Sequence, residues 1–412
     1  MTPPASSPLD GVRAVARAAS TDPLVVRVLK RRLARPDAPT FDLETPDGAV
    51  HRIGAGATPS FRLRLRNAAA RRALASLDET SIGEAYMNGD VDFAGDFLAA
   101  LDLRKFLSDA HWLSSLWRFV QPLVFGRVAS DKRWVGQHYD YGDDFYFTFL
   151  DRRFKLYSQA LFESDDQPLE DAVEAKLAYI VRACRLGAGS HVLDVGGGWG
   201  SFAGYAGARG ANVTMLTISP AQYAYLTRWS EEHGLPGRLD AVYEDVFAYA
   251  PGRRYDAIVL LGVMEHLPDY RRLFAKFDEL LRPNGRLYMD FAAGRQKFAV
   301  SSFTYRYVFP GDHTPVVVPD LLAAANATRF EPIAIHNDRH AYYLTLQAWA
   351  RNLEAAHDEL APRFGERTYR LFQMYLWGGA HQMQRDGTLE SYRIVFQKSL
   401  GSPSTEIGLE QL

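Results

Sequence analysis

One segment near the middle of the chain constrains the fold more than any other. It reads HVLDVGGGWGSFAGYAGARGANVTMLTIS, and its pattern predicts a strand over His191–Val195, a glycine-rich turn over Gly196–Gly200, a helix over Ser201–Arg209 and a second strand over Asn212–Thr217. Strands that alternate with helices in this way are typical of a doubly wound α/β sheet. Glycines in the turn let the backbone approach a ligand closely at the carboxyl edge of such a sheet. The segment therefore predicts a nucleotide-like ligand at this edge.

Two details of the segment favour S-adenosylmethionine over NAD, which remains the alternative. Asp194 stands directly before the turn, where a carboxylate suits a cationic amino-acid group better than a pyrophosphate. The second strand ends in Thr217-Ile218-Ser219 and lacks the acidic residue that an NAD site places about 20 residues after its glycine-rich turn.

Three later segments place acidic side chains after predicted strands. They are AVYEDVFAYA (Ala241–Ala250), YDAIVLLGVMEHL (Tyr255–Leu267) and LRPNGRLYMD (Leu281–Asp290). In the first, Glu244 and Asp245 are positioned to meet an adenine. In the other two, Glu265 and Asp290 follow buried strands. Because ligands bind at the carboxyl ends of the strands in open α/β sheets, we expect these side chains at one edge.

The composition excludes a disordered, a collagen-like or a disulfide-stapled chain. The chain has 412 residues, 47% apolar and 23% charged, which is ordinary for a folded chain of two or three domains. The single cysteine, Cys184, can form neither an intramolecular disulfide nor a cysteine-rich metal site. His138 and His266 lack metal-ligand spacing, so we expect no metal. Without a signal peptide or a long apolar stretch, the sequence predicts a cytoplasmic protein.

Charge is distributed unevenly along the chain. Residues 1–75 hold 13 Lys and Arg against 6 Asp and Glu, although the whole chain has a net charge of −2, which gives no reason to expect nucleic-acid binding. The basic residues cluster in Val25–Pro36 and Phe61–Arg72. Either they form a solvated face, or they form a patch for anionic lipid. Arginines at 62, 64 and 66 alternate with leucines, which predicts a strand with a basic outer face.

These patterns predict three regions. Residues 1–20 are rich in Pro, Ser and Ala and are expected to be flexible; residues 21–125 form a small mixed domain with the basic patch; and residues 126–412 form the α/β domain. The Trp-rich stretch WLSSLWRFVQPLVFG, within residues 106–135, predicts an apolar helix interrupted at Pro122. That helix serves either as core or interdomain contact, or as a membrane-interface element.

A set of motifs over roughly residues 60–400 resembles the cyclopropane fatty acid synthase family, which includes the mycolic acid cyclopropane synthases. The motifs are GEAYMNGDVDF (Gly83–Phe93), QHYDYGDDFYFTFLD (Gln137–Asp151), Tyr157-Ser158, LEDAVEAKL (Leu169–Leu177), VLDVGGGWGSFA, TISPAQ (Thr217–Gln222), GVMEH (Gly262–His266) and YVFPG (Tyr307–Gly311). The resemblance implies a class I methyltransferase fold, Rossmann-like, with a smaller mixed N-terminal domain. It also implies methyl transfer from S-adenosylmethionine to an unsaturated phospholipid acyl chain, and a homodimer. Together with the basic patch, this leads us to expect peripheral association with the inner face of an anionic membrane.

The resemblance also implies which residues hold the cofactor. They are Tyr157, Ser158, Gly196, Gly198, Thr217, Gln222 and Asp245. The strand and turn pattern points independently to the glycines and Asp245, and adds Asp194 and Glu244.

The chain departs from the family at the residues that would hold the base, which removes a proton after methyl addition. The resemblance implies a bicarbonate ion as base, held by a Cys, a Glu, a His and a Tyr. Glu265 and Tyr342 match two of these positions, whereas Gln159 replaces the Cys and Asp290 replaces the His. An ionised Asp290 would repel bicarbonate, which makes that ion doubtful here. His138 is a fifth candidate catalytic residue.

Three readings of this departure remain open. Asp290 or Glu265 itself takes the proton; or bicarbonate-type ring closure does not occur, and a methyl-branched chain replaces a cyclopropane; or Asp290 points elsewhere and another residue acts. A further alternative is a repurposed member of the family that binds S-adenosylmethionine or lipid, acts in a later fatty-acid modification such as a furan fatty acid pathway, and transfers no methyl group.

Overall fold

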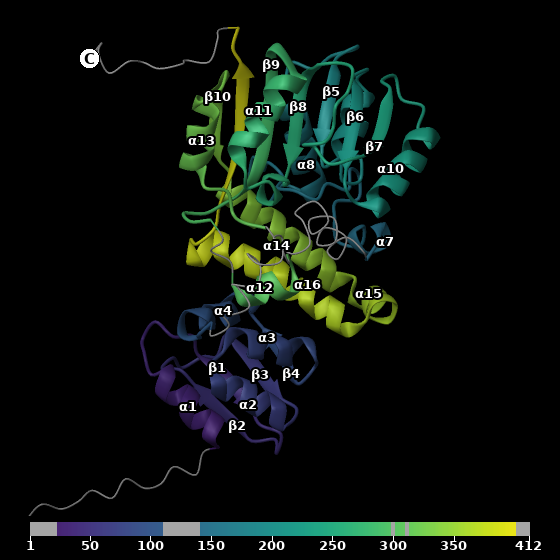
Figure 1. The fold of residues 1–412 in the computed structure, drawn as a ribbon. Helices are drawn as coiled ribbons and strands as arrows, with labels where there is room; N and C mark the ends of the chain where they lie inside the picture. The colour runs from purple at the N-terminus through teal and green to yellow at the C-terminus, as the bar shows by residue number, and fades with distance from the viewer. Residues whose placement is uncertain (1–22, 110–140, 298–300, 310–312, 401–412) are drawn as a thin grey trace, which may run out of the picture.

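The computed structural model describes residues 23–109, 141–297, 301–309 and 313–400, and these contain two β-sheets (Figure 1). We call residues 23–109 the N-terminal unit and residues 141–400 the large unit. Four predictions lie outside the described residues: the flexible region 1–20, the Trp-rich helix beyond residue 109, the domain boundary at residues 125/126, and the role of His138.

The N-terminal unit is a four-stranded sheet, in the order β2-β1-β3-β4, covered by short helices. Its elements are α1 (Leu24–Arg32), β1 (Phe41–Glu44), β2 (Val50–Ile53), β3 (Phe61–Leu65), α2 (Ala68–Ser76), α3 (Glu79–Met87), β4 (Val91–Gly95), α4 (Phe97–Leu101) and the 3-10 helix η1 (Asp102–Phe106). The helices α2, α3 and α4 begin where Asn67, Asp78 and Asp96 accept hydrogen bonds from backbone N–H groups of the first turn. The capping side chains therefore determine where these three helices begin.

The large unit contains a seven-stranded sheet in the order β10-β11-β9-β8-β5-β6-β7. Its strands are β5 (His191–Val195), β6 (Asn212–Thr217), β7 (Leu239–Tyr243), β8 (Tyr255–Leu261), β9 (Leu281–Ala293), β10 (Phe330–Asn337) and β11 (Glu390–Lys398). Strands β5 to β9 run parallel, whereas β11 is antiparallel to both of its neighbours. The predicted α/β sheet is confirmed, with both strands of the central segment at their expected bounds.

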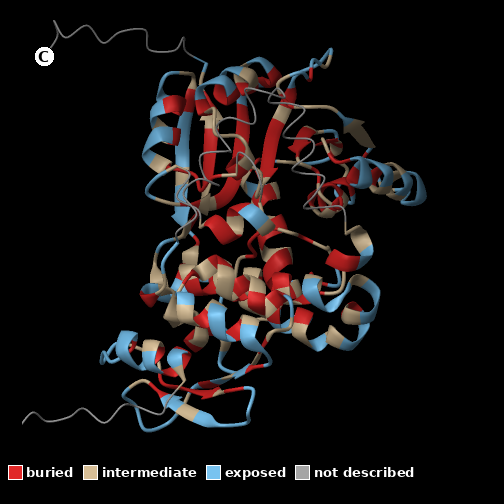
Figure 2. Cartoon of the chain, turned by 60° about the horizontal axis from the view of Figure 1, so that its bottom comes forward, coloured by how far each residue is buried: buried red, intermediate tan, exposed pale blue. Residues whose placement is uncertain are grey.

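The helices of the large unit cover both faces of this sheet or lie beyond the carboxyl ends of its parallel strands (Figure 1). They are α7 (Asp143–Tyr146), α8 (Leu169–Ala183), α9 (Ser201–Gly207), α10 (Pro220–Glu232), η2 (Met264–His266), α11 (Tyr270–Leu280), α12 (Ser302–Tyr307), α13 (Val318–Asn326), α14 (Arg339–Ala355), α15 (His357–Phe364), α16 (Glu366–His381) and η3 (Gln382–Asp386). Val192 packs in one buried cluster and the next residue, Leu193, in another, because successive side chains of a strand point to opposite faces. The strands are accordingly buried throughout the centre of the unit (Figure 2).

A layer of helices lies between the large sheet and the N-terminal unit. Helices α14 and α16 pack together, α16 also contacts α3 and α4, and α12 contacts α3 (Figure 1). Arg370 of α16 makes an ion pair of 3.2 Å with Asp92, and His381 Nε2 lies 2.9 Å from Oδ1 of Asp102. These contacts hold the two units together through directed polar interactions.

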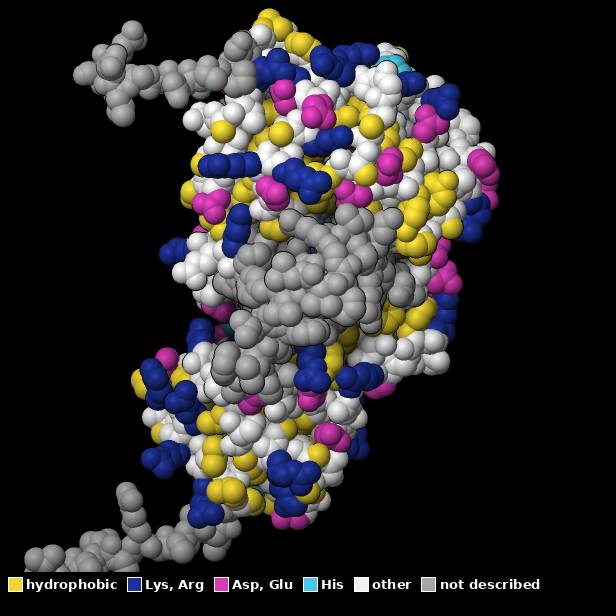
Figure 3. Space-filling model, viewed as in Figure 1, with side chains coloured by type: hydrophobic (Ala, Val, Ile, Leu, Met, Phe, Trp, Pro, Cys, Tyr) yellow, Lys and Arg dark blue, Asp and Glu magenta, His cyan; other side chains and the backbone are white. Residues whose placement is uncertain are grey.

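Several basic residues of the N-terminal unit form ion pairs with acidic residues. Arg64 lies 2.9 Å from Glu44, Arg62 lies 3.8 Å from Asp42, and Arg66 pairs with Asp92. The strand predicted over these arginines is confirmed as β3, but its basic outer face is largely neutralised by acidic residues from neighbouring strands. Figure 3 shows acidic side chains among the basic ones over the lower end of the molecule.

No helix among the described residues is long and apolar enough to span a membrane. Cys184 is buried at the carboxyl end of α8, where burial raises the pKa of its thiol to about 12.

Candidate functional site

Two cavities open at the carboxyl edge of the large sheet. The smaller, of about 150 Å³, is called the cofactor cavity here, and the larger, of about 290 Å³, the apolar cavity. All nine residues predicted to bind the cofactor line the smaller one: Tyr157, Ser158, Asp194, Gly196, Gly198, Thr217, Gln222, Glu244 and Asp245. The structure thus brings together side chains from four separate segments.

The glycine-rich turn shapes the floor of the cofactor cavity. Gly196 and Gly198 have φ angles of +79° and +52°, in a region that side chains other than glycine rarely adopt. A Cβ atom on Gly196 would lie 2.5 Å from a methyl group of Val263, so a larger residue would also clash. The turn therefore presents backbone to the cavity.

Asp194 is the charged group best suited to the amino-acid end of S-adenosylmethionine. Its side chain is 2% exposed, and its Oδ1 atom has no hydrogen-bond partner among the described residues. Burial raises the pKa of Asp194 to about 7. A buried carboxylate at a cavity wall, with one oxygen that lacks a hydrogen-bond partner among the described residues, fits an ammonium group, so these residues fit the predicted cofactor.

Residues at and after the ends of β6 and β7 also line this cavity. The Thr217 hydroxyl donates to Oε1 of Gln222 at 2.8 Å, and Ser219 begins α10 by accepting from the backbone N–H of Gln222. Glu244 N donates to the carbonyl of Thr217 at 3.1 Å, which fixes the backbone beside Asp245. These contacts order the polar groups before any ligand binds.

The apolar cavity meets the cofactor cavity at four residues that line both: Tyr157, Gly262, His266 and Phe309. Beyond this junction, its wall contains hydrocarbon and aromatic side chains from α14 and α16, and then from the N-terminal unit. A ligand in one cavity therefore lies beside a ligand in the other.

Glu265 is the candidate base at this junction. It follows β8 in the short helix η2 and is 5% exposed. Its Oε1 accepts from the backbone N–H of Ala292 at 2.6 Å, while Oε2 has no hydrogen-bond partner among the described residues. Burial raises the pKa of Glu265 to about 7, and Tyr342 lines the same cavity.

The sequence reasoning singled out Tyr342 but not its neighbours Leu346 and Trp349 on the cavity wall, and it considered His266 only as a metal ligand. Burial lowers the pKa of His266 to about 4, so that its ring is neutral near pH 7. Tyr342, Leu346 and Trp349 of α14 all line the apolar cavity. Their i, i+4, i+7 spacing was a signal in the sequence, but it does not distinguish a cavity wall from a packed core.

Gln159 and Asp290 line neither cavity. Oδ2 of Asp290 lies 2.9 Å from Nζ of Lys176, and Oδ1 accepts from the backbone N–H of Gly262 at 3.1 Å. Burial raises the pKa of Asp290, and the Lys176 ammonium opposes that shift. Gln159 donates to Asp338 at 3.0 Å. Of the open readings, this arrangement agrees with the one in which Asp290 points elsewhere, because internal partners hold both Asp290 and Gln159.

Among the described residues, no group of three or more His, Cys, Asp and Glu side chains is arranged to hold a metal ion.

Two families match the chain. Residues 127–394 match the family described as mycolic acid cyclopropane synthetase, and residues 28–108 match a domain of unknown function. The first match covers more than half of the chain.

Characterised relatives include lipid-modifying enzymes. The chain is 28% identical over 339 residues to the sphingolipid C9-methyltransferase of Candida albicans, with 77% of this chain and 66% of that one covered. It is 29% identical over 330 residues to the cyclopropane-fatty-acyl-phospholipid synthase of Escherichia coli, with 77% and 83% covered. The chain thus matches just under two thirds of the length of the Candida protein.

Solved structures match the large unit's fold. The cyclopropane synthase MmaA2 from Mycobacterium tuberculosis is 26% identical, with a TM-score of 0.60 over 65% of this chain and 98% of that one. The mycolic acid cyclopropane synthase CmaA1, in complex with SAH and CTAB, gives the same values. A coclaurine N-methyltransferase at 18% identity shares the fold, with a TM-score of 0.59. The predicted class I methyltransferase fold is confirmed.

Proposed function

Because the chain belongs to the mycolic acid cyclopropane synthetase family, we propose that it transfers the methyl group of S-adenosylmethionine to the double bond of an unsaturated phospholipid acyl chain. The observation that carries this proposal is the junction of the two cavities, where Tyr157, Gly262, His266 and Phe309 line both. A polar cavity with an unpartnered carboxylate thereby adjoins a long apolar one, as a charged methyl donor and a hydrocarbon acceptor require.

The cofactor, when bound, supplies an electrophilic methyl group. Asp194 would hold its ammonium group, and Glu244 and Asp245 would lie at its adenosine end. The chain's part in the transfer is to align the two ligands and to exclude water from the junction.

Addition of a methyl group to an alkene leaves a positive charge on the acyl chain. Tyr157, Tyr342, Trp349 and Tyr375 line the apolar cavity on the catalytic side. Aromatic faces stabilise a cation by roughly 1–2 kcal/mol each when water is excluded. The aromatic wall would therefore lower the barrier without reacting itself.

Glu265 would then take the proton. Its unpartnered Oε2 and its raised pKa, about 7, suit a base that works near neutral pH. Two of the four positions that the resemblance assigns to bicarbonate, Gln159 and Asp290, are held by internal partners, so we propose that this chain uses its own carboxylate.

The relatives favour a methyl-branched product over a ring. Loss of a proton from the added methyl group closes a cyclopropane, whereas loss from a neighbouring carbon leaves a branched chain. The relatives named sphingolipid C9-methyltransferases agree with that direction.

The enzyme would meet its lipid at the inner face of an anionic membrane. Lys30 and Arg31 lie in the last turn of α1, and Leu24 at its start is 64% exposed. Basic residues and an exposed apolar side chain on one short helix suit a membrane surface. The homodimer stays a prediction.

The test is mass spectrometry of unsaturated phospholipid vesicles after incubation with the protein and methyl-labelled S-adenosylmethionine. The proposal expects a gain of one labelled carbon, and hydrogenation then distinguishes a branched alkene from a ring. A ring would contradict the product proposed here. Absence of label across several acyl chains, in a protein shown to bind the cofactor, would favour the repurposed alternative.

A further inference from the structure

The apolar cavity does not end in the large unit. It continues into the N-terminal unit, where Leu29 and Leu33 of α1, Phe41 of β1, Leu63 of β3 and Leu74 of α2 line it. We call this part the distal section. Four of these five side chains are buried members of the unit's hydrophobic core. The core of the small unit therefore encloses space that is continuous with the catalytic junction.

A space of this kind is unfavourable unless something fills it. Protein interiors are close-packed, and an unfilled core cavity costs about 24 cal/mol for each Å³. A unit of fewer than 100 residues has little stability to spare. The distal section therefore points to an apolar ligand.

Three helical glycines border the cavity, Gly83, Gly378 and Gly379, and two of them bear on how open it is. Gly83 lies inside α3, and a Cβ atom there would lie 2.7 Å from the ring of Phe303, so the glycine lets α12 approach. Gly378 lies inside α16, and a Cβ atom there would have no neighbour within 4 Å. Glycine inside a helix costs about 1 kcal/mol relative to alanine. At Gly378 no packing contact requires it, and its effect is to leave the cavity clear.

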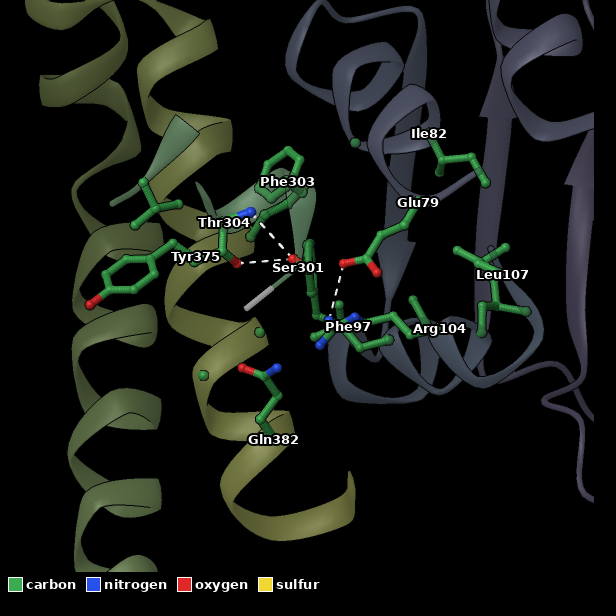
Figure 4. Close-up of a pocket in the computed structure, with 18 of the residues that line it drawn as sticks. Glu79, Ile82, Phe97, Arg104, Leu107, Ser301, Phe303, Thr304, Tyr375 and Gln382 are labelled. Atoms are coloured by element: carbon green, nitrogen blue, oxygen red, sulfur yellow. Dashed lines mark hydrogen bonds and ion pairs between the residues drawn. The ribbon is translucent and has the colours of Figure 1, made fainter. Parts of the chain in front are cut away.

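The cavity is more polar where it crosses between the units. Figure 4 shows Glu79 and Arg104 from the N-terminal unit facing Ser301 and Thr304 across it. Arg104 and Glu79 form an ion pair of 3.1 Å, and the hydroxyls of Ser301 and Thr304 lie 3.1 Å apart. Apolar sections thus lie on both sides of a polar crossing.

We propose that the distal section binds a hydrocarbon chain of the lipid substrate, so that the N-terminal unit selects lipids by chain length. This inference rests on the proposed function, which makes a lipid the occupant of the catalytic end. The hydrocarbon is either the methyl end of the reacting chain or the second acyl chain of the same lipid; in the second case, the glycerol esters occupy the polar crossing.

Photocrosslinking in the full-length protein tests the inference without requiring turnover. One phosphatidylglycerol probe carries a diazirine near the methyl end of its monounsaturated chain, and another carries it near the methyl end of its saturated chain. Each probe is added to the protein in vesicles and irradiated, and the labelled peptides are identified by mass spectrometry. A parallel sample contains excess unmodified lipid as competitor. We expect competable labelling within residues 24–107 from one probe, and that probe identifies the chain.

Labelling confined to the large unit, or no competable labelling, overturns the inference. Methyl transfer to the unmodified lipid is measured in the same samples. Labelling of the distal section without methyl transfer would support the lipid site and contradict the proposed function. Methyl transfer without labelling of the distal section would support the proposed function and contradict the lipid site.

A matched pair of variants tests chain selection. Ala100 of α4 lines the cavity, whereas Ala68, the first residue of α2, is exposed. Ala100→Phe should shift the ratio of rates on long and short acyl chains about tenfold towards short chains, as one or two methylenes do in an apolar pocket. Ala68→Phe should leave the ratio unchanged. An unchanged ratio in a folded Ala100→Phe protein, judged by its thermal unfolding, would also overturn the inference.

Discussion

The Nζ atom of Lys176 lies 2.9 Å from Oδ2 of Asp290, and the two side chains are 0% and 1% exposed. The same ammonium donates to the hydroxyl of Ser158 at 2.6 Å, and the same carboxylate accepts from the backbone N–H of Gly262. Ser158 and Gly262 both line the cofactor cavity. The buried pair therefore joins two segments of the cavity wall and acts as a positioning element.

Breaking this pair should destabilise the protein strongly. Asp290→Asn leaves an ammonium in the interior without its counter-ion, and Lys176→Met leaves the carboxylate, so each should lower the free energy of unfolding by about 3–5 kcal/mol. The double variant should lose less than the sum, because it leaves neither charge alone. Urea unfolding at pH 7 measures all three. Glu359→Gln, which breaks an exposed pair with Arg363, is the control and should cost no more than about 1 kcal/mol. Additive losses would contradict this account.

Glu265→Gln should lower kcat by about 10²–10⁴-fold and leave cofactor binding intact, because the amide cannot accept the proton. The pH profile gives a second readout. The carboxylate accepts a proton only when ionised, and its pKa is about 7, so the wild-type rate should fall as pH drops below 7. The residual rate of the variant should not show this fall below pH 7. Equal pH profiles for the two proteins would exclude Glu265 as the base.

Asp194→Asn should weaken binding of S-adenosylhomocysteine by at least about tenfold at pH 8, the loss expected for a buried charge-assisted hydrogen bond. In the wild type, the pKa of Asp194 is about 7, so its carboxylate is protonated at lower pH and affinity should fall as pH drops below 7. Titration calorimetry between pH 5.5 and 8.5 measures both effects. Asp240→Asn, at a half-exposed position on β7, should change neither. A pH-dependent affinity that persists in Asp194→Asn would assign the titration to another group.

Gly378→Leu should block the apolar cavity without unfolding the protein. A Cβ atom at this position meets nothing within 4 Å, and leucine favours a helix more than glycine does. We therefore expect methyl transfer to lipid to be lost, while the melting temperature is unchanged or raised and S-adenosylhomocysteine still binds. Gly378→Ala is the matched control and should retain most activity. Full activity of the leucine variant would show that the acyl chain takes another path.

Lys30→Gln combined with Arg31→Gln should weaken binding to anionic vesicles. Each basic residue near such a surface contributes about 1 kcal/mol, so the pair should lower the affinity by about 30-fold, and the difference should shrink as salt is added. Vesicle sedimentation measures it. Arg64→Gln, which removes a basic residue of β3 that pairs with Glu44, is the control. Salt-insensitive binding, or an equal effect in the control, would remove the basic turn of α1 from the membrane contact.

The sequence alone was sufficient to predict the α/β sheet and the edge of it that lines the cofactor cavity. Strands β5 and β6 have the bounds that the apolar pattern predicts, since a strand–turn–helix unit is specified by local periodicity and by glycine's freedom at positive φ. The carboxyl ends of parallel strands meet at one edge, so side chains that follow separate strands come together. Asp194, Thr217 and Asp245 line one cavity for that reason.

Only the tertiary structure decided which polar side chains face that cavity. Asp290 lies near the carboxyl end of β9, where a base could stand, yet Lys176 from α8 pairs with it. Gln159 is held by Asp338, 179 residues away in the sequence. The apolar cavity likewise needs both units, since helices of the large unit and strands of the N-terminal unit share its wall. Local pattern determines backbone conformation, whereas a buried charge takes whichever opposite charge the packing of distant segments brings within reach.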